Sequence, residues 1–125
     1  MLKKKLGIHA IERDWDVISR PYNYYKIPST LIIPEGVERI GKNAFYKYEE
    51  LEKVEIPGSV NTIRGNAFRG CRKLGKVVIP GNVEKIGEFA FWECKNAEIK
   101  LMKLKKKSRR IGPCAFEGCK KLIRE

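Results

Sequence analysis

The sequence predicts a repeat solenoid that is rich in short parallel strands and contains little helix. A unit of 23 residues recurs three times in register and a fourth time with a small insertion. Each unit carries the alternating apolar residues that are typical of short strands, and Gly and Pro separate one strand from the next. One unit of this length cannot bury its apolar side chains alone, so neighbouring units must stack.

The repeated unit reads I-P-x-x-V-x-x-I-G-x-x-A-F-x-x-C-x-x-L-x-x-V-x and then returns to Ile-Pro. Its part from Ile-Pro to Ala-Phe occupies 33–45, 56–68 and 79–91, and its second half returns at 111–116, where the offset is 25 residues. Because stacking places equal positions above one another, we expect continuous buried ladders. The two main ladders are Ile40, Ile63, Ile86, Ile111 and Phe45, Phe68, Phe91, Phe116.

One strand is expected at the end of each unit, where apolar residues alternate before the Ile-Pro pair. The apolar residues of two such strands are Leu51, Val54, Ile56 and Leu74, Val77, Ile79. Proline then ends the strand at a point where a missing N–H is tolerated. The Ala-Phe pair lies too close to the preceding Gly for a long helix, so a turn or 3₁₀ segment is expected there.

This string of residues resembles the BspA-like leucine-rich repeats, also called the Treponema pallidum type. The resemblance covers residues 31–125. It implies a curved solenoid with a parallel sheet on its concave face and turns or 3₁₀ segments opposite. It also implies a binding role without catalytic residues or a cofactor, because members of the family look like surface or secreted adhesion proteins of bacteria and protists.

We divide the chain into an N-terminal segment, 1–30, and a solenoid, 31–125. The expected repeats lie near 33–55, 56–78, 79–103 and 104–125. The N-terminal segment breaks the period, although Leu6-Gly7-Ile8-His9-Ala10-Ile11 echoes Ile-Gly-x-x-Ala-Phe. It is therefore either an irregular cap or a degenerate half-repeat.

The junction between the third and fourth units, 97–110, lacks the Ile-Pro pair and leaves two registers open. Leu104 takes the Ile position if two extra residues precede it. Leu101 takes that position if a longer loop follows instead. The alternation of Ile99 and Leu101 favours the second register.

The cysteines and the histidine give no pattern that is typical of a metal or catalytic site. Cys71, Cys94 and Cys119 share one repeat position and should stack at the strand spacing of about 5 Å. This Cα separation permits a disulfide, but parallel inward side chains keep the sulfur atoms about 5 Å apart, well beyond the bond length of about 2.05 Å. We therefore interpret them as reduced core thiols. Cys114 and Cys119 lack a second pair of ligands for zinc, and His9 is the one histidine. We expect no enzyme activity, no metal and no cofactor.

Positive charge is concentrated at the same junction. The chain has a net charge of +12, and residues 100–110 hold seven basic side chains and no acid. Outside them, 20 basic and 15 acidic residues remain. The basic side chains are Lys100, Lys103, Lys105, Lys106, Lys107, Arg109 and Arg110. We propose them as partner-binding residues, against the alternative of a solvated loop.

Three further residues are candidates for partner binding. Trp92 lies where other units have polar residues, so it is either an exposed contact residue or a cover for the Lys-rich junction through a cation–π contact. Glu55 and Val78 lie between inward-facing strand positions, in a row that starts at Ile32 and continues through Lys100 or Lys103. This mixed row favours a protein partner with an acidic surface. The alternative is a basic adaptor that binds nucleic acid or a nucleoprotein surface through 100–110.

Two expectations concern the setting of the chain. No apolar run approaches the roughly 18 residues needed to cross a bilayer, and the first residues do not form a secretory signal. With unpaired thiols, this favours the cytoplasm, whereas a fragment of a secreted or cell-surface protein is the alternative. The chain also stops at 120–125, before a further expected strand. We expect an open edge there, which a second copy of the chain would cover.

Overall fold

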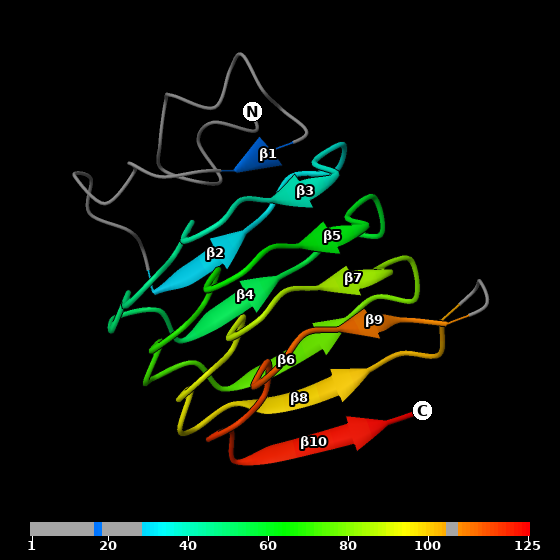
Figure 1. Cartoon of the computed structure of the whole chain (residues 1–125). Helices are drawn as coiled ribbons and strands as arrows, with labels where there is room; N and C mark the ends of the chain where they lie inside the picture. The colour runs from blue at the N-terminus through cyan, green and yellow to red at the C-terminus, as the bar shows by residue number, and fades with distance from the viewer. Residues whose placement is uncertain (1–16, 19–28, 105–107) are drawn as a thin grey trace.

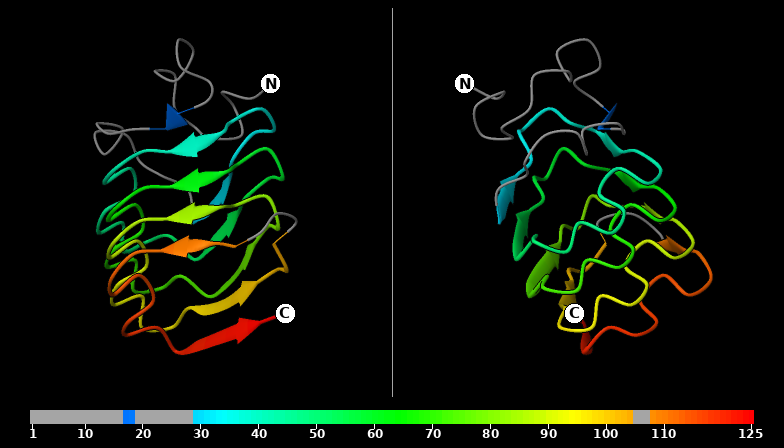
Figure 2. Two further views of the ribbon diagram at one scale, coloured as in Figure 1. Left: turned by 45° about the vertical axis from the view of Figure 1, so that its right-hand side comes forward. Right: turned by 90° about the vertical axis from the view of Figure 1, so that its left-hand side faces the viewer.

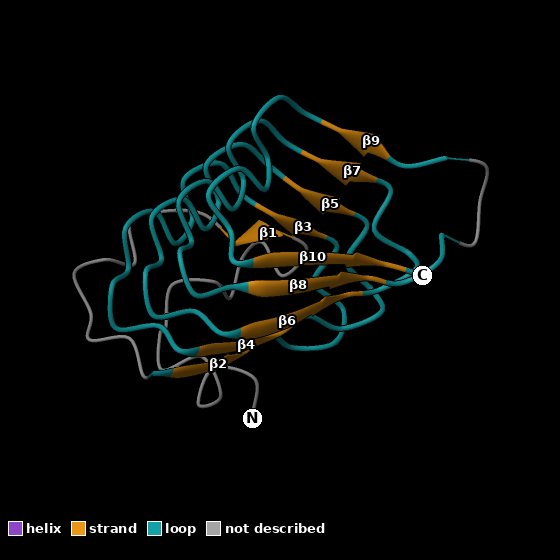
Figure 3. Ribbon diagram, turned by 90° about the horizontal axis from the view of Figure 1, so that it is seen from below, coloured by secondary structure: helices purple, strands orange, loops and turns teal. Residues whose placement is uncertain are grey.

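The computed structural model of the chain describes residues 17–18, 29–104 and 108–125. The described chain winds as a solenoid with parallel strands on two sides and stacked turns on a third side (Figures 1 and 3). Within these ranges it consists of strands, turns and irregular segments, without helix. The predicted fold class, a leucine-rich-repeat solenoid of about four units, is confirmed.

Each coil contributes one strand to each of two strand-bearing sides. The first side, which we call the odd-strand sheet, runs in the order β1 (Val17–Ile18), β3 (Arg39–Ile40), β5 (Thr62–Ile63), β7 (Lys85–Ile86) and β9 (Arg110–Ile111). The second side, the even-strand face, carries β2 (Thr30–Ile32), β4 (Lys53–Glu55), β6 (Lys76–Ile79), β8 (Glu98–Leu101) and β10 (Lys121–Arg124). On it, β2 pairs with β4, β6 pairs with β8 and β8 with β10, and β4 lies beside β6. Figure 2 shows both sides of the stack.

The odd-strand sheet was not predicted. The sequence placed its Ile column in the core, but it offered only two extended residues per unit, which is too short a run for an alternation pattern. Parallel pairing between coils makes these dipeptides strands, because Ile40 lies opposite Ile63 and Ile63 opposite Ile86. The strands of this sheet therefore depend on the neighbouring coils.

The register at the junction is the one in which Leu101 takes the Ile position. Ile79 lies opposite Leu101 and Val77 opposite Ile99, so both apolar residues of β8 point into the core. The boundary placed near residue 104 is therefore wrong: the extra residues follow β8, and β9 begins only at Arg110. The short 22-residue step from Ile79 to Leu101 keeps the side-chain alternation intact.

Both predicted ladders are present in the core. The rings of Phe45 and Phe68 stack with centroids 5.3 Å apart, those of Phe68 and Phe91 at 5.0 Å, and those of Phe91 and Phe116 at 5.6 Å. The Ile ladder is buried through its first three members, whereas Ile111 and Phe116 in the last coil are only partly buried.

The cysteine ladder is part of the same core. The Cys71 thiol donates a hydrogen bond to the Phe45 carbonyl at 3.2 Å, and Cys94 donates to the Phe68 carbonyl at 3.0 Å. Cys119 repeats this contact with the Phe91 carbonyl at 3.2 Å. Each thiol thus ties its coil to the one before it. Cys71 and Cys94 are buried and all four cysteines are free, as predicted for core thiols.

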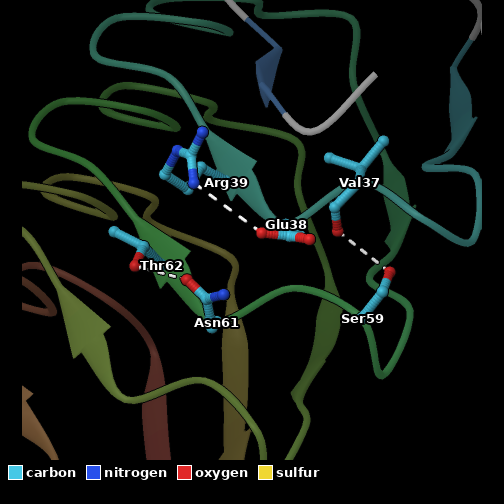
Figure 4. Close-up of polar contacts among 6 residues, drawn as sticks. All are labelled: Val37, Glu38, Arg39, Ser59, Asn61 and Thr62. Carbon is cyan, nitrogen blue, oxygen red and sulfur yellow. Dashed lines mark hydrogen bonds and ion pairs between the residues drawn. The ribbon is translucent and has the colours of Figure 1, made fainter. Parts of the chain in front are cut away.

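Polar side chains join the turns that follow the Ile-Pro positions. The Ser59 hydroxyl accepts a hydrogen bond from the Gly36 amide and donates one to the Val37 carbonyl, both at 2.9 Å. Figure 4 shows the contact with Val37, together with the Arg39–Glu38 ion pair and the Thr62–Asn61 hydrogen bond. In the last coil the Arg109 guanidinium donates to the Val83 carbonyl, and Val83 occupies the same repeat position as Val37.

Two glycines allow neighbouring coils to approach closely. A Cβ atom at Gly87 would overlap the Gly65 amide nitrogen and lie 2.7 Å from the Arg64 carbonyl carbon. A Cβ atom at Gly112 would lie 2.5 Å from the Glu88 nitrogen. These separations are too short for a Cβ atom. Gly87 and Gly112, which we call the glycine column, therefore allow the backbones of neighbouring coils to approach each other.

The expectation for the C-terminal end is contradicted, whereas that for the N-terminal end stays open. The Leu6–Ile11 echo lies outside the described residues, and the strand that pairs with β3 is instead β1, at Val17–Ile18. The choice between a cap and a half-repeat for 1–30 stays a prediction. At the other end we expected the chain to stop before a further strand, which is wrong. Residues Lys121–Arg124 form β10, which pairs in parallel with β8 because Leu122 lies opposite Ile99.

Candidate binding surfaces

The structure distributes the predicted partner-binding residues over three sides of the solenoid. Glu55, Val78 and Lys100 lie together on the even-strand face. Arg110 lies in the odd-strand sheet, and Trp92 belongs to the stacked turns of the third side. Lys105, Lys106 and Lys107 are outside the described residues.

The even-strand face presents a continuous outward row across the solenoid. Val78 lies opposite Lys100, and Lys100 lies opposite Ile123, so Lys100 rather than Lys103 continues the row. On the other half of the face, Ile32 lies opposite Glu55. The Lys100 ammonium forms an ion pair with Glu125 at 3.3 Å. Val78 is 50% exposed and Ile123 is 37% exposed, and they are the exposed large apolar residues of the described chain.

The neighbouring row of the same face is mainly basic. Lys76 lies opposite Glu98, and Glu98 lies opposite Lys121. The Glu98 carboxylate contacts Lys120 at 3.7 Å. Lysine side chains therefore flank the exposed apolar residues Val78 and Ile123. Strand alternation in the sequence indicates Val78. It does not indicate Ile123, because no strand is expected at the end of the chain.

The described members of the basic junction do not form one patch. Lys100 and Arg110 lie on different sheets, and the exposed Lys103 follows β8. Arg109 is used within the fold: its Nε donates to the Val83 carbonyl at 2.7 Å, and its guanidinium also donates to the Pro80 carbonyl at 3.1 Å. Burial, followed by the charge of Arg124, lowers the pKa of this guanidinium.

A shallow groove crosses the odd-strand sheet, and sequence analysis did not identify it. It measures about 410 Å³ and lies over the glycine column, with Arg64, Lys85 and Arg110 among its lining residues. No acidic or aromatic side chain lines it. The repeat alignment indicates a basic row at this groove, because Lys85 and Arg110 occupy the same repeat position.

Trp92 contacts a cation of the preceding coil rather than the Lys-rich junction. The Arg69 guanidinium carbon lies 4.5 Å from the centroid of the Trp92 ring and 5.0 Å from that of Phe89. Phe89 and Trp92 meet edge to face at 5.9 Å. Trp92 thus has a cation–π contact with the second coil, whereas its contact with the basic junction, part of which lies outside the described residues, stays a prediction.

Within 17–18, 29–104 and 108–125, the structure brings together no group of three or more His, Cys, Asp or Glu side chains that could hold a metal ion. His9 lies outside these ranges. In the same ranges no helix has the length and apolar character needed to span a membrane.

Comparisons with known proteins agree with this architecture. Residues 19–124 match the family described as the BspA type leucine rich repeat region, six copies. No curated protein matches the chain. Two solved structures are similar, each with 21% sequence identity: a leucine rich cell surface protein from Faecalibacterium prausnitzii A2-165 and a leucine-rich repeat protein from Bacteroides ovatus ATCC 8483.

The Faecalibacterium structure superposes with a TM-score of 0.62, over 86% of this chain and 34% of its own length. The Bacteroides structure gives a TM-score of 0.47, over 84% of this chain and 40% of its own. This chain thus spans about a third of the length of the Faecalibacterium protein. The likeness to the Faecalibacterium structure shows a shared fold, and the match over 19–124 shows the family. The chain belongs to the BspA type leucine-rich repeat family.

Proposed function

We propose that this repeat scaffold binds a protein partner through its even-strand face and performs no catalysis. The observation that carries the proposal is the row Val78, Lys100, Ile123, in which two exposed apolar side chains flank a lysine on three adjacent strands. Adjacent strands lie about 4.8 Å apart, so the two apolar residues are about 10 Å apart. Exposed apolar side chains among charged ones give this face the mixed composition that is usual for a protein interface.

The charge of the face indicates the chemistry of the partner. Lys76 and Lys121 lie beside the apolar residues, and Glu98 between them contacts Lys120. A partner surface that combines apolar side chains with carboxylates would satisfy both features. Charge complementarity of this kind steers association and selects the partner.

Nucleic-acid binding is the second candidate, and the groove with Arg64, Lys85 and Arg110 favours it. Two observations weaken it. Lys100 and Arg110 lie on different sides, so the described basic residues of 100–110 do not act as a single patch. The groove also lacks an aromatic side chain on which a base would stack.

For the location we propose a fragment of a secreted or cell-surface protein. The Faecalibacterium structure is that of a cell surface protein, and this chain covers about a third of it. The cytoplasmic alternative rested on the free thiols and on the first residues of the chain. None of the comparisons supports it.

The proposal is tested with a displayed library of random peptides, selected against the purified chain. We expect enriched peptides to combine apolar and acidic residues, and Val78→Asp to weaken their binding by about tenfold or more, as for a central interface residue. Lys85→Ala is the matched control, because it lowers the charge by the same one unit on the odd-strand sheet.

Two outcomes contradict the proposal. The first is a selection without enrichment, or equal loss of binding in Val78→Asp and Lys85→Ala. The second is binding of duplex DNA at low salt that falls steeply with ionic strength and survives Val78→Asp. That result would favour the nucleic-acid candidate, because each phosphate contact contributes about 0.9 log units of affinity per decade of salt.

A further inference from the structure

The stacked turns of the third side carry an aromatic and arginine wall. Tyr46, Arg69 and Trp92 occupy one repeat position in three successive coils, and backbone hydrogen bonds join these coils, with Lys47 N to Arg69 O at 2.7 Å and Gly70 N to Trp92 O at 2.8 Å. The Arg69 guanidinium carbon lies 4.5 Å from the Trp92 centroid and 5.9 Å from that of Tyr46. A guanidinium held against aromatic faces is oriented before any ligand arrives.

This wall is held by backbone of an unfavourable kind. Phe89 has φ +58°, in the left-handed region that bulky residues avoid. Asn43, Asn66 and Cys114 occupy the same repeat position, and asparagine tolerates this conformation well. Phe89 packs against Trp92 at 5.9 Å and under Arg69 at 5.0 Å. The strained residue therefore supports the Arg69–Trp92 contact, and strain of this kind clusters at functional positions.

Gly70 lies beside this wall. Lys47, Gly70 and Glu93 share the next repeat position, and all three have positive φ, at 57°, 75° and 57°. Gly70 therefore contributes backbone to the lining of a notch, and a Cβ atom there would lie 3.2 Å from the Cγ atom of Lys47. The notch measures about 360 Å³ and spans three coils (the turns are visible in Figure 3).

The far side of the notch is lined by a third row, Glu49, Arg72 and Lys95. Arg72 and Lys95 have no ion pair among the described residues, and their side chains are exposed. In total the lining carries four cations and two carboxylates: Lys47, Arg69, Arg72, Lys95, Glu49 and Glu93. The notch is therefore cationic, and it also contains acceptors.

We propose that this notch binds the acidic sugar unit of a glycan. A sugar acid presents one carboxylate, which suits the guanidinium groups of Arg69 and Arg72. Its hydroxyl groups donate hydrogen bonds, which suits Glu49 and Glu93, whereas a bare anion would be repelled by both. The aromatic wall offers apolar surface to the ring, and a compact cavity of this size suits one ring rather than an extended chain.

The test is titration of the full chain with glucuronic acid, observed by NMR at the Trp92 indole in a Trp15→Phe background. We expect saturable shifts, with binding of glucose weaker by about tenfold or more because it lacks the carboxylate. Gly70→Asn should abolish the shifts, because the new side chain would fill the notch. The backbone should tolerate this substitution, because Lys47 and Glu93 at the same repeat position already carry side chains at positive φ. Arg72→Gln should weaken binding by about tenfold.

Lys42→Gln, which removes an exposed cation outside the lining of the notch, is the control and should bind as the parent does. Should Gly70→Asn fail to fold, Arg72→Gln alone decides, because its exposed side chain contributes little to the core. Equal binding of glucose, or binding that neither variant at the notch reduces, would overturn the proposal. Equal binding of triglutamate would also overturn it, by showing a general carboxylate site that suits an acidic peptide.

Discussion

The third and fourth coils carry the same residue types at the same positions, yet they are buried to different extents. Ile86, Phe91 and Cys94 are buried, whereas Ile111, Phe116 and Cys119 are only partly buried. The side chains do not explain this difference. The third coil has a coil on each side, while the fourth has one only on the side of the third. In a solenoid, burial of a ladder residue is thus a property of its neighbours as much as of its own position.

The largest expected effect is the loss of the Phe68 ring. Phe68→Ala should lower the free energy of unfolding by about 3–5 kcal/mol, because the ring is fully buried between Phe45 and Phe91 and its removal leaves a cavity. Phe116→Ala, at the same repeat position, should cost at most about 2 kcal/mol, because its ring is already partly exposed. Urea denaturation of both variants measures the comparison, and equal losses would contradict it.

A smaller effect is expected at the glycine column. Gly87→Ala should destabilise by about 1–3 kcal/mol, because the new methyl group meets the backbone of Gly65 and Arg64. Gly112→Ala should cost less, although its Cβ would lie 2.5 Å from the Glu88 nitrogen. The last coil can shift outward, whereas the third coil is held on both sides.

Gly75→Ala is the control for this pair, because a Cβ at Gly75 would lie 3.7 Å from the Glu52 carbonyl oxygen, an ordinary contact. Its melting temperature should stay close to that of the parent. A greater loss in Gly112→Ala than in Gly87→Ala would show that the last coil is as rigid as the inner ones.

The smallest effect concerns the thiols. Alkylation of the native chain should modify the partly exposed Cys114 before the buried Cys71 and Cys94, whereas contact with Cys94 and burial raise the pKa of Cys119 and slow its reaction. The pKa of Cys94 is raised to about 12, since contact with Cys119 acts downward but contact with Cys71 and burial outweigh it. Mass spectrometry of partly labelled chain gives the order, and early labelling of Cys94 would mean that the inner coils open readily.

The same pKa predicts a dependence of stability on pH. Cys94 remains neutral in the folded chain, whereas the unfolded thiol ionises near its ordinary value of 9.0. The contribution of neutral Cys94 to the free energy of unfolding is therefore complete below pH 9. It is lost as pH rises toward 12, by at most about 1.4 kcal/mol per pH unit. Cys94→Ala should flatten this part of the curve, whereas the control Val83→Ala, which removes buried atoms of the same coil but no titrating group, should leave its slope unchanged. Identical slopes in parent and Cys94→Ala would refute the assignment.

Part of the candidate surfaces was readable from the sequence. Glu55 and Val78 were assigned to one outward row because strand alternation places every second residue on the same face. The row continued through Lys100 only once the register of the junction was known, and Ile123 joined it because β10 pairs with β8. The sequence does not show on which side the basic residues of 100–110 lie, because Lys100 belongs to β8 whereas Arg110 belongs to β9. Arg109 donates hydrogen bonds to carbonyl groups of the third coil.

The sequence by itself determined the solenoid and its core, because a constant period puts Phe45, Phe68 and Phe91 in one column whatever the detailed shape of the coil. A repeated offset needs no distant information. Only the tertiary structure decided which further features the stacked coils form. The odd-strand sheet exists because neighbouring coils pair, and the notch above Gly70 depends on side chains of three coils meeting Arg69 and Trp92. Both features arise from contacts between coils. The period aligns the equivalent residues, but it does not show that two extended residues pair as strands, nor what unlike side chains at one repeat position form together.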